Sequence, residues 1–187
     1  NLPLLGVSQV TAPGKFYEWK QRPTFLPLIT AGQAPIFGTR DQILQAISSP
    51  DFRPAAQAYF DVQLKSRLRV QGPARATLRD VACSASRIAF TVEAGSPCLV
   101  VIAQTHYPHW RARIDGRPAE IFPVNHAFQA VETGPGKRSV VLEYVDPYFR
   151  AGCGVTLGTV ILLAGLYGCA FRPKREKRGS PSYRPGG

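Results

Sequence analysis

Hydrophobic and polar residues alternate in short runs along the second half of the chain, which is the pattern of strands that bury one face. In the segment RIAFTVE, for example, Ile88, Phe90 and Val92 fall on one face and polar or small residues on the other. Seven such runs predict a mainly β fold, an antiparallel β-sandwich or barrel-like domain. The predicted strands are 77–83, 87–93, 98–104, 110–115, 120–124, 128–133 and 139–145.

Turn signals connect these runs. Asp115-Gly116 lies between two of them, and a two-residue hairpin turn needs the positive φ that Asp and Gly tolerate. The segment 134–137, Gly-Pro-Gly-Lys, predicts a second turn.

Prolines interrupt every periodic stretch of the first 75 residues. One short helix is predicted there over 41–47, introduced by Thr39 and ended by the Ser-Ser-Pro sequence at 48–50. The segments 4–10 and 25–31 are predicted to be short strands beside it.

A segment of twenty-one uncharged residues separates Arg150 from Arg172. As a helix it would be about 30 Å long, which matches the hydrocarbon core of a bilayer. A buried helix of a soluble protein is the alternative, but a strongly cationic sequence follows directly. We therefore predict a single C-terminal transmembrane helix over 150–171.

The formal net charge of +11 is concentrated at the C-terminus, because the tail 172–187 has six Lys and Arg residues and one acidic residue, a net charge of +5. Cationic flanks favour the cytoplasmic side of a membrane. This predicts a disordered basic tail inside the cell and residues 1–148 outside the cytoplasm. No nucleic-acid-binding motif accompanies the charge, so nucleic acid is not a predicted partner.

Small residues recur every four positions in the predicted span: Gly154 and Gly158, then Ala164 and Gly168. This spacing lets a second membrane helix approach closely. The alternative is that glycine is simply common in membrane helices.

Four segments follow from these patterns. They are a Pro-rich mixed segment 1–75 packed on the β domain, the β domain 76–148, the span 150–171 and the tail 172–187. The chain contains no Met. We expect it to be part of a longer protein or to be processed upstream.

Six aromatic, cationic and amide residues are candidates for binding a sugar or a lipid-linked phosphate. Alternatively, the aromatic ones pack in the core and the arginines lie on a solvated face, and this second interpretation is favoured. The candidates are Tyr107, His109, Trp110, Arg111, Asn125 and His126.

No pattern of nucleophile and base, of metal ligands or of a phosphate-binding loop is present. No catalytic residue, metal or cofactor is therefore predicted. Cys83 and Cys98 would face an oxidising compartment, where they either form a disulfide or remain free. The predicted distance between their strand ends favours free thiols.

One series of residues runs from the predicted β domain to the start of the predicted span: Thr105, Tyr107, Pro108, Trp110, Asp115, Gly116, Asn125, Ala127, Phe128, Gly136, Tyr144 and Pro147. In order and spacing this series resembles the C-terminus of the YfhO-like family of bacterial membrane proteins. The stretch 41–54 is also similar to the family, so the resemblance covers roughly residues 36–172. Two positions depart from the family pattern: His109, where Gly is usual, and Arg138, where His is frequent.

The resemblance implies a polytopic parent in the bacterial inner membrane, similar to glycosyltransferases that use polyprenyl-phosphate sugars. The carboxylates of such enzymes lie in an N-terminal membrane part that this sequence does not include. We therefore expect a non-catalytic accessory domain that contacts the bilayer, upstream membrane helices and a lipid-linked sugar or envelope glycan. The alternative is a membrane-anchored binding module for envelope glycan or a partner protein.

Overall fold

The computed structural model describes residues 9–12, 14–21 and 25–170. The chain divides into two compact units, Asn1–Val145 and Asp146–Gly187. The predicted tail and most of the predicted strand 4–10 lie outside the described residues.

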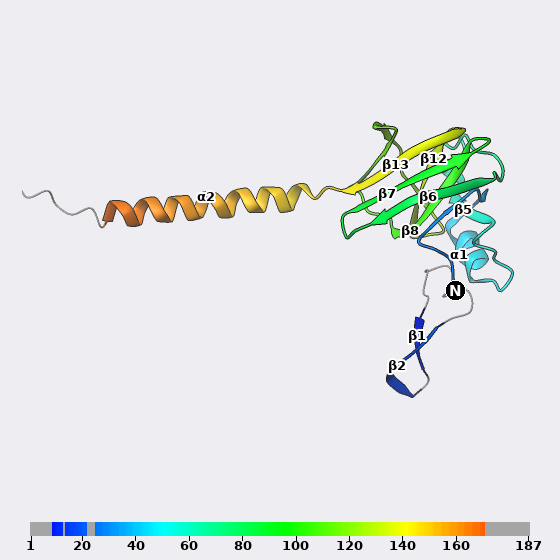
Figure 1. The fold of residues 1–187 in the computed structure, drawn as a ribbon, viewed down its shortest axis with the longest axis horizontal. Helices are drawn as coiled ribbons and strands as arrows, with labels where there is room; N and C mark the ends of the chain where they lie inside the picture. The colour runs from blue at the N-terminus through cyan, green and yellow to red at the C-terminus, as the bar shows by residue number, and fades with distance from the viewer. Residues whose placement is uncertain (1–8, 13, 22–24, 171–187) are drawn as a thin grey trace, which may run out of the picture. The chain divides into compact units, whose positions relative to one another are not determined.

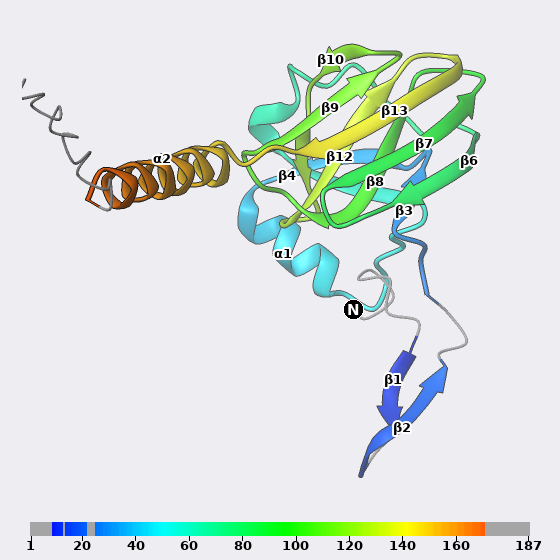
Figure 2. The same ribbon diagram turned by 60° about the vertical axis from the view of Figure 1, so that its left-hand side comes forward.

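Two antiparallel sheets form the main part of the first unit (Figures 1 and 2), so the predicted mainly β, antiparallel fold is confirmed. The five-stranded sheet has the order β10 (Arg117–Ala119), β9 (Trp110–Ile114), β13 (Gly136–Tyr144), β7 (Arg87–Ala94) and β6 (Ala76–Cys83). The four-stranded sheet has the order β11 (Phe122–Val124), β12 (Phe128–Thr133), β8 (Cys98–Thr105) and β3 (Ile29–Ala31).

The main core lies between these two sheets. Strand β7 contributes Ile88, Phe90 and Val92, each at most 2% exposed, exactly every second residue as the alternation predicts. Strand β8 is buried on both faces from Cys98 to Ile102. One face packs against the five-stranded sheet, and a further layer of the chain covers the other.

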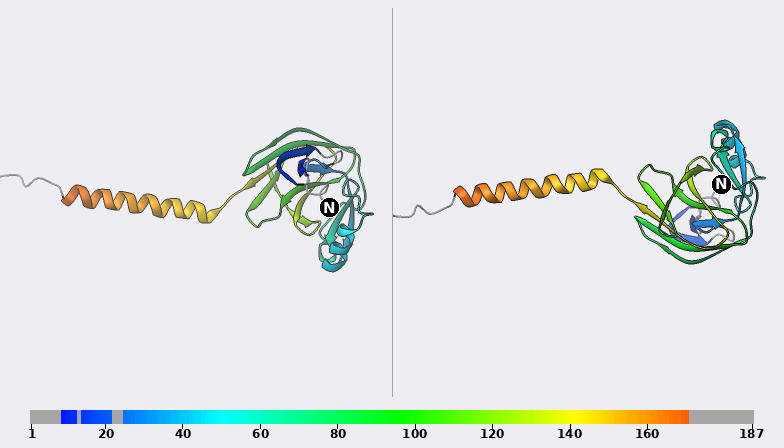
Figure 3. Two further views of the ribbon diagram at one scale, coloured as in Figure 1. Left: turned by 90° about the horizontal axis from the view of Figure 1, so that it is seen from below. Right: turned by 90° about the horizontal axis from the view of Figure 1, so that it is seen from above.

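That further layer consists of residues from the first 75. Strand β4 (Ala34–Gly38), helix α1 (Arg40–Ser48) and strand β5 (Gln57–Asp61) follow one another, and the two strands pair in parallel. With the 3₁₀ turn η1 (Val62–Leu64), this segment buries Phe60 against the four-stranded sheet. Figure 3 shows the cyan segment with α1 outside the green strands.

The predicted hairpin at Asp115-Gly116 is confirmed: φ is +51° and +77° at the two residues, between β9 and β10. The predicted helix is confirmed within α1. The side chain of Thr39 accepts a hydrogen bond from Gln42 N, and Gln42 Oε1 accepts one from Thr39 N, which closes a capping box. The remaining described elements of this unit are β1 (Gln9–Ala12) and β2 (Lys15–Gln21), which pair antiparallel.

The second unit contains α2 (Pro147–Ala170), which is long and apolar enough to cross a membrane, and no residue of its apolar window is buried. It begins three residues before the predicted span. The carboxylate of Asp146 accepts hydrogen bonds from Tyr148 N and Phe149 N and so caps the free N–H groups of the first turn.

Candidate functional site

A hollow of about 590 Å³ lies at the edge of β9, and we name it the β9-edge hollow. Strand β10 pairs with β9 only from Ile114 to Ala112, and the chain then leaves toward β11 in the other sheet. The first residues of β9 therefore have a strand neighbour on the β13 side alone. The lining residues are His106, Tyr107, Pro108, Trp110, Arg111, Ala112, Arg113, Pro118, Ala119, Glu120 and Ile121.

The wall of the β9-edge hollow combines a buried aromatic with exposed polar groups. Trp110 is 7% exposed and packs edge-on against Tyr144, with 5.6 Å between ring centroids, so most of its indole belongs to the core. Tyr107 is 55% exposed, and Arg111 and Arg113 are exposed beside it. A ligand would meet a phenol and two guanidinium groups here.

Three of the six sequence-predicted residues, Tyr107, Trp110 and Arg111, thus come together. The ring of His109 lies 6.0 Å from that of Tyr144 in a T-shaped arrangement and does not line this hollow. The other two residues lie on the β11–β12 turn.

Asn125 is 4% exposed, and its amide is structural. Asn125 Oδ1 accepts a hydrogen bond from Tyr59 N at 2.8 Å, and Asn125 N donates to Tyr59 O at 2.8 Å. Asn125 and His126 both have positive φ, 48° and 73°. The turn therefore attaches β5 to the sheet through the backbone N–H and the side-chain Oδ1 of Asn125.

His126 lines a separate hollow of about 380 Å³. Arg40 of α1, Tyr59 and Asp61 also line it. The loop that carries Tyr107 adjoins the β11–β12 turn, because His106 N donates to Ala127 O at 2.8 Å. The two parts of the predicted set are neighbours in the backbone, but His126 lines a different hollow from Tyr107, Trp110 and Arg111.

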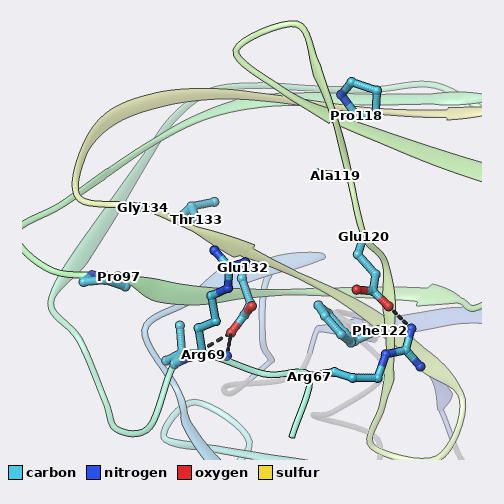
Figure 4. A pocket seen from close by; sticks show the side chains of 11 residues that line it. Arg67, Arg69, Pro97, Pro118, Ala119, Glu120, Phe122, Glu132, Thr133 and Gly134 are labelled. Atoms are coloured by element: carbon cyan, nitrogen blue, oxygen red, sulfur yellow. Dashed lines mark hydrogen bonds and ion pairs between the residues drawn. The ribbon is translucent and has the colours of Figure 1, made fainter.

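A third hollow, about 480 Å³, was not predicted from the sequence (Figure 4). Arg67 forms an ion pair with Glu120, and its guanidinium carbon lies 5.9 Å from the centroid of Phe122. Glu132 Oε1 accepts hydrogen bonds from Arg69 N at 2.7 Å and Val70 N at 2.8 Å. Both carboxylates are already engaged, so this hollow offers no unpaired acid for catalysis. The alternation of arginine and apolar residues at 67–70 is the sequence pattern that could have indicated these lining residues.

Two groups outside the hollows have shifted pKa values. Hydrogen bonds from Ser139 N and from the side chain of Arg138 lower the pKa of Asp115. Burial raises the pKa of the Cys98 thiol, and the hydrogen bond with Thr133 partly opposes that effect. Cys83 is exposed, and both thiols are free. A buried neutral thiol is a poor nucleophile.

Within the described ranges, no three His, Cys, Asp or Glu side chains group in a way that could hold a metal ion. The predicted helix-packing positions Gly154 and Gly158 lie on α2, where an added Cβ would meet nothing within 4 Å. Ala164 is also exposed. Gly168 lies on α2 as well, but its exposure is outside what the structure describes.

No family model matches the chain, and no curated protein or solved structure is similar enough to it to count as a match.

Proposed function

We propose that the chain is the membrane anchor and extracytoplasmic accessory domain at the C-terminus of a polytopic bacterial inner-membrane protein. On this proposal the parent resembles glycosyltransferases that use polyprenyl-phosphate sugars, and the domain itself is non-catalytic. The observation that carries the proposal is α2, whose large apolar side chains are 58–71% exposed from Val155 to Leu166. A continuous apolar surface of this size is unfavourable in water. The hydrocarbon core of a bilayer covers such a surface along the whole length of a helix.

The direction of insertion rests on charge. The cationic tail follows α2, and Lys and Arg favour the cytoplasmic flank of a membrane helix. The first unit, which precedes α2 in the chain, is then outside the cytoplasm.

A membrane-anchored binding module is the second candidate function. It is favoured by the β9-edge hollow, where Tyr107 and Arg111 are both exposed lining residues. The native reading frame upstream of Asn1 separates the two candidates. Several encoded membrane helices support the accessory domain, whereas a translation start close to Asn1 would leave only the binding module.

Membrane anchoring is tested by alkaline carbonate extraction of membranes that contain the full chain. The change is Ile161→Lys together with Leu162→Lys, which places two charges in the middle of α2. Each costs about 2.5–3.5 kcal/mol on insertion scales. We expect the unchanged chain to stay in the membrane pellet and the double variant to appear in the supernatant.

The matched control is Val62→Lys together with Val81→Lys, because these apolar residues are 50% and 52% exposed in the first unit. This control should remain in the pellet. Release of the unchanged chain by carbonate, or retention of the Ile161 and Leu162 double variant, would contradict anchoring by α2.

A further inference from the structure

Among the residues that the structure describes, none forms a layer over one face of the five-stranded sheet. Its inner face carries Phe90, Val140 and Leu142, which are at most 2% exposed, so the alternate residues of β7 and β13 point away from the core. The four-stranded sheet, by contrast, is covered on its outer side by the segment with Phe60 and Leu68. The outer face of the five-stranded sheet therefore meets whatever surrounds the domain.

This outer face is cationic. Its charged residues are five cations and two acids, and we call it the basic face: Arg79, Arg87, Arg111, Arg113, Lys137, Glu93 and Glu143. Glu143 is paired with Arg87, whose Nε lies 3.3 Å from Glu143 Oε1. The acid nearest to Arg111 in the register is thus already engaged.

The strand register spreads the cations across the sheet. Arg111 is opposite Glu143, and Arg113 is opposite Val141, which is opposite Ala89. Arg79 of β6 is opposite Thr91 of β7, three strands away from β9. Arg111 lies three strands away from Arg79 and four residues away along the strand direction, so at about 4.8 Å per strand and about 3.4 Å per residue the two arginines are roughly 20 Å apart across the face. Neither Arg79 nor Arg111 makes a side-chain hydrogen bond or ion pair within the described part of the chain.

The floor between these arginines bears hydroxyl groups. Its side chains are small: Ala89 and Val141 in one row, and Thr91 and Ser139 in the next. None of the outward positions of β7, β9 and β13 carries an aromatic ring. A sugar ring can lie on such a floor, with hydroxyls of the protein in reach of hydroxyls of the sugar.

We propose that the basic face binds an acidic glycan, a sugar chain that bears carboxylate or phosphate groups. Guanidinium groups pair with these anions through two parallel hydrogen bonds, and Thr91 and Ser139 supply neutral partners between them. A single-stranded nucleic acid would need aromatic stacking platforms, which these positions lack. A lipid surface would favour several large apolar side chains among the cations, and Val141 is the sole apolar residue larger than alanine at the outward positions of β7, β9 and β13, all of which lie in the described part of the chain. The inference rests on the proposed extracytoplasmic location, where envelope glycans occur.

The experiment measures binding of polygalacturonate, which carries one carboxylate per sugar, to the full chain in detergent micelles. The test variant is Arg79→Gln together with Arg111→Gln. The matched control is Arg53→Gln together with Lys65→Gln, because it removes the same charge from exposed residues in the segment that covers the other sheet. Circular dichroism of each variant shows that the fold is retained.

We expect the test variant to bind about tenfold or more weakly than the unchanged chain, since two charge-assisted contacts are lost. The control variant should bind as the unchanged chain does, and neutral dextran should not bind. Equal weakening by both variants, no weakening by either, or equal binding of dextran would overturn the proposal. Preferential binding to phosphatidylglycerol vesicles, with the same dependence on Arg79 and Arg111, would assign the face to lipid instead. Carbonate extraction reports on anchoring independently, so the two proposals can fail separately.

Discussion

Asp115 connects the β9–β10 hairpin to strand β13. Its Oδ1 accepts a hydrogen bond from Ser139 N at 2.9 Å, and its Oδ2 accepts one from Arg138 Nη1 at 3.0 Å. Its own backbone N–H donates to Ser139 O at 2.8 Å. Two residues of β10, Pro118 and Ala119, line the β9-edge hollow. By holding the β9–β10 hairpin against β13, the Asp115 carboxylate helps to position this wall of the hollow.

Replacing Asp115 by Asn should make stability less dependent on pH. The folded pKa of Asp115 is lowered, so its stabilising contribution is present above the unfolded pKa of about 3.9 and is lost as the pH falls through the folded value. Asn keeps an acceptor for Ser139 and tolerates positive φ, so the charge is the main change. We expect a lower melting temperature at pH 7 and convergence with the unchanged chain at acidic pH. The exposed Asp51→Asn variant is the control, and an identical pH profile of the Asp115 and Asp51 variants would refute this role.

At the scale of single residues, the sequence predicted the turn whose conformation depends only on the residues in it. Asp115-Gly116 is a familiar pair for left-handed backbone, and the structure has it there. Asn125-His126 adopts left-handed φ as well, but this pair lacks the glycine that makes Asp-Gly a distinctive two-residue turn signal. The separation of His126 from Tyr107, Trp110 and Arg111 into different hollows depends on that turn and could not be predicted.

Gly32 is the element-scale feature on which the attachment of β3 depends. Its φ is +90°, and a Cβ at this position would overlap the backbone carbonyl oxygen of Ala74. Gly32 N donates to Leu99 O at 2.8 Å, and Gly32 O accepts from Ala74 N at 3.0 Å. The backbone that follows β3 therefore lies directly against the backbone at Ala74.

Gly32→Ala should lower the free energy of unfolding by about 3 kcal/mol or more, because left-handed strain of about 1–3 kcal/mol adds to a backbone overlap. Gly72→Ala is the matched control, since nothing lies within 4 Å of a Cβ there and its φ is ordinary. Urea unfolding followed by Trp fluorescence measures both. Similar stabilities of the two variants would show that the approach of Gly32 to Ala74 does not constrain the fold.

Among the elements, those with local signals were predicted and those formed by distant pairing were not. The alternation in 87–93 predicted β7, and Thr39 together with the Ser-Ser-Pro sequence at 48–50 predicted α1. The parallel pair of β4 and β5 was missed, because Pro35 lies inside one strand and the sequence SSPDFRP precedes the other. Parallel pairing also requires a crossover connection, here α1, which the alternation of residues does not reveal.

At the scale of the whole molecule, long-range contacts decide the architecture. Strand β3 joins the second sheet through Ile29 opposite Ile102, more than seventy residues away. The sequence alone predicts that the first 75 residues pack on the β domain, but it does not specify that β3 pairs with β8. The apolar segment of α2, in contrast, needs no partner within the chain to be recognised, and its predicted helical span agrees with the structure to within a few residues at each described end.

The central claim, a first unit outside the cytoplasm on a single membrane helix, is tested most directly by thiol labelling of intact spheroplasts. In a Cys153→Ala, Cys169→Ala background, a membrane-impermeant maleimide should label the exposed Cys83 as fast as it does after detergent solubilisation. Cys98 should react only after unfolding, because it is fully buried and its thiol pKa is raised by burial. A Cys83→Ser change should abolish labelling of the folded chain. Labelling of Cys83 only after the membrane is opened would place the first unit in the cytoplasm and contradict the account.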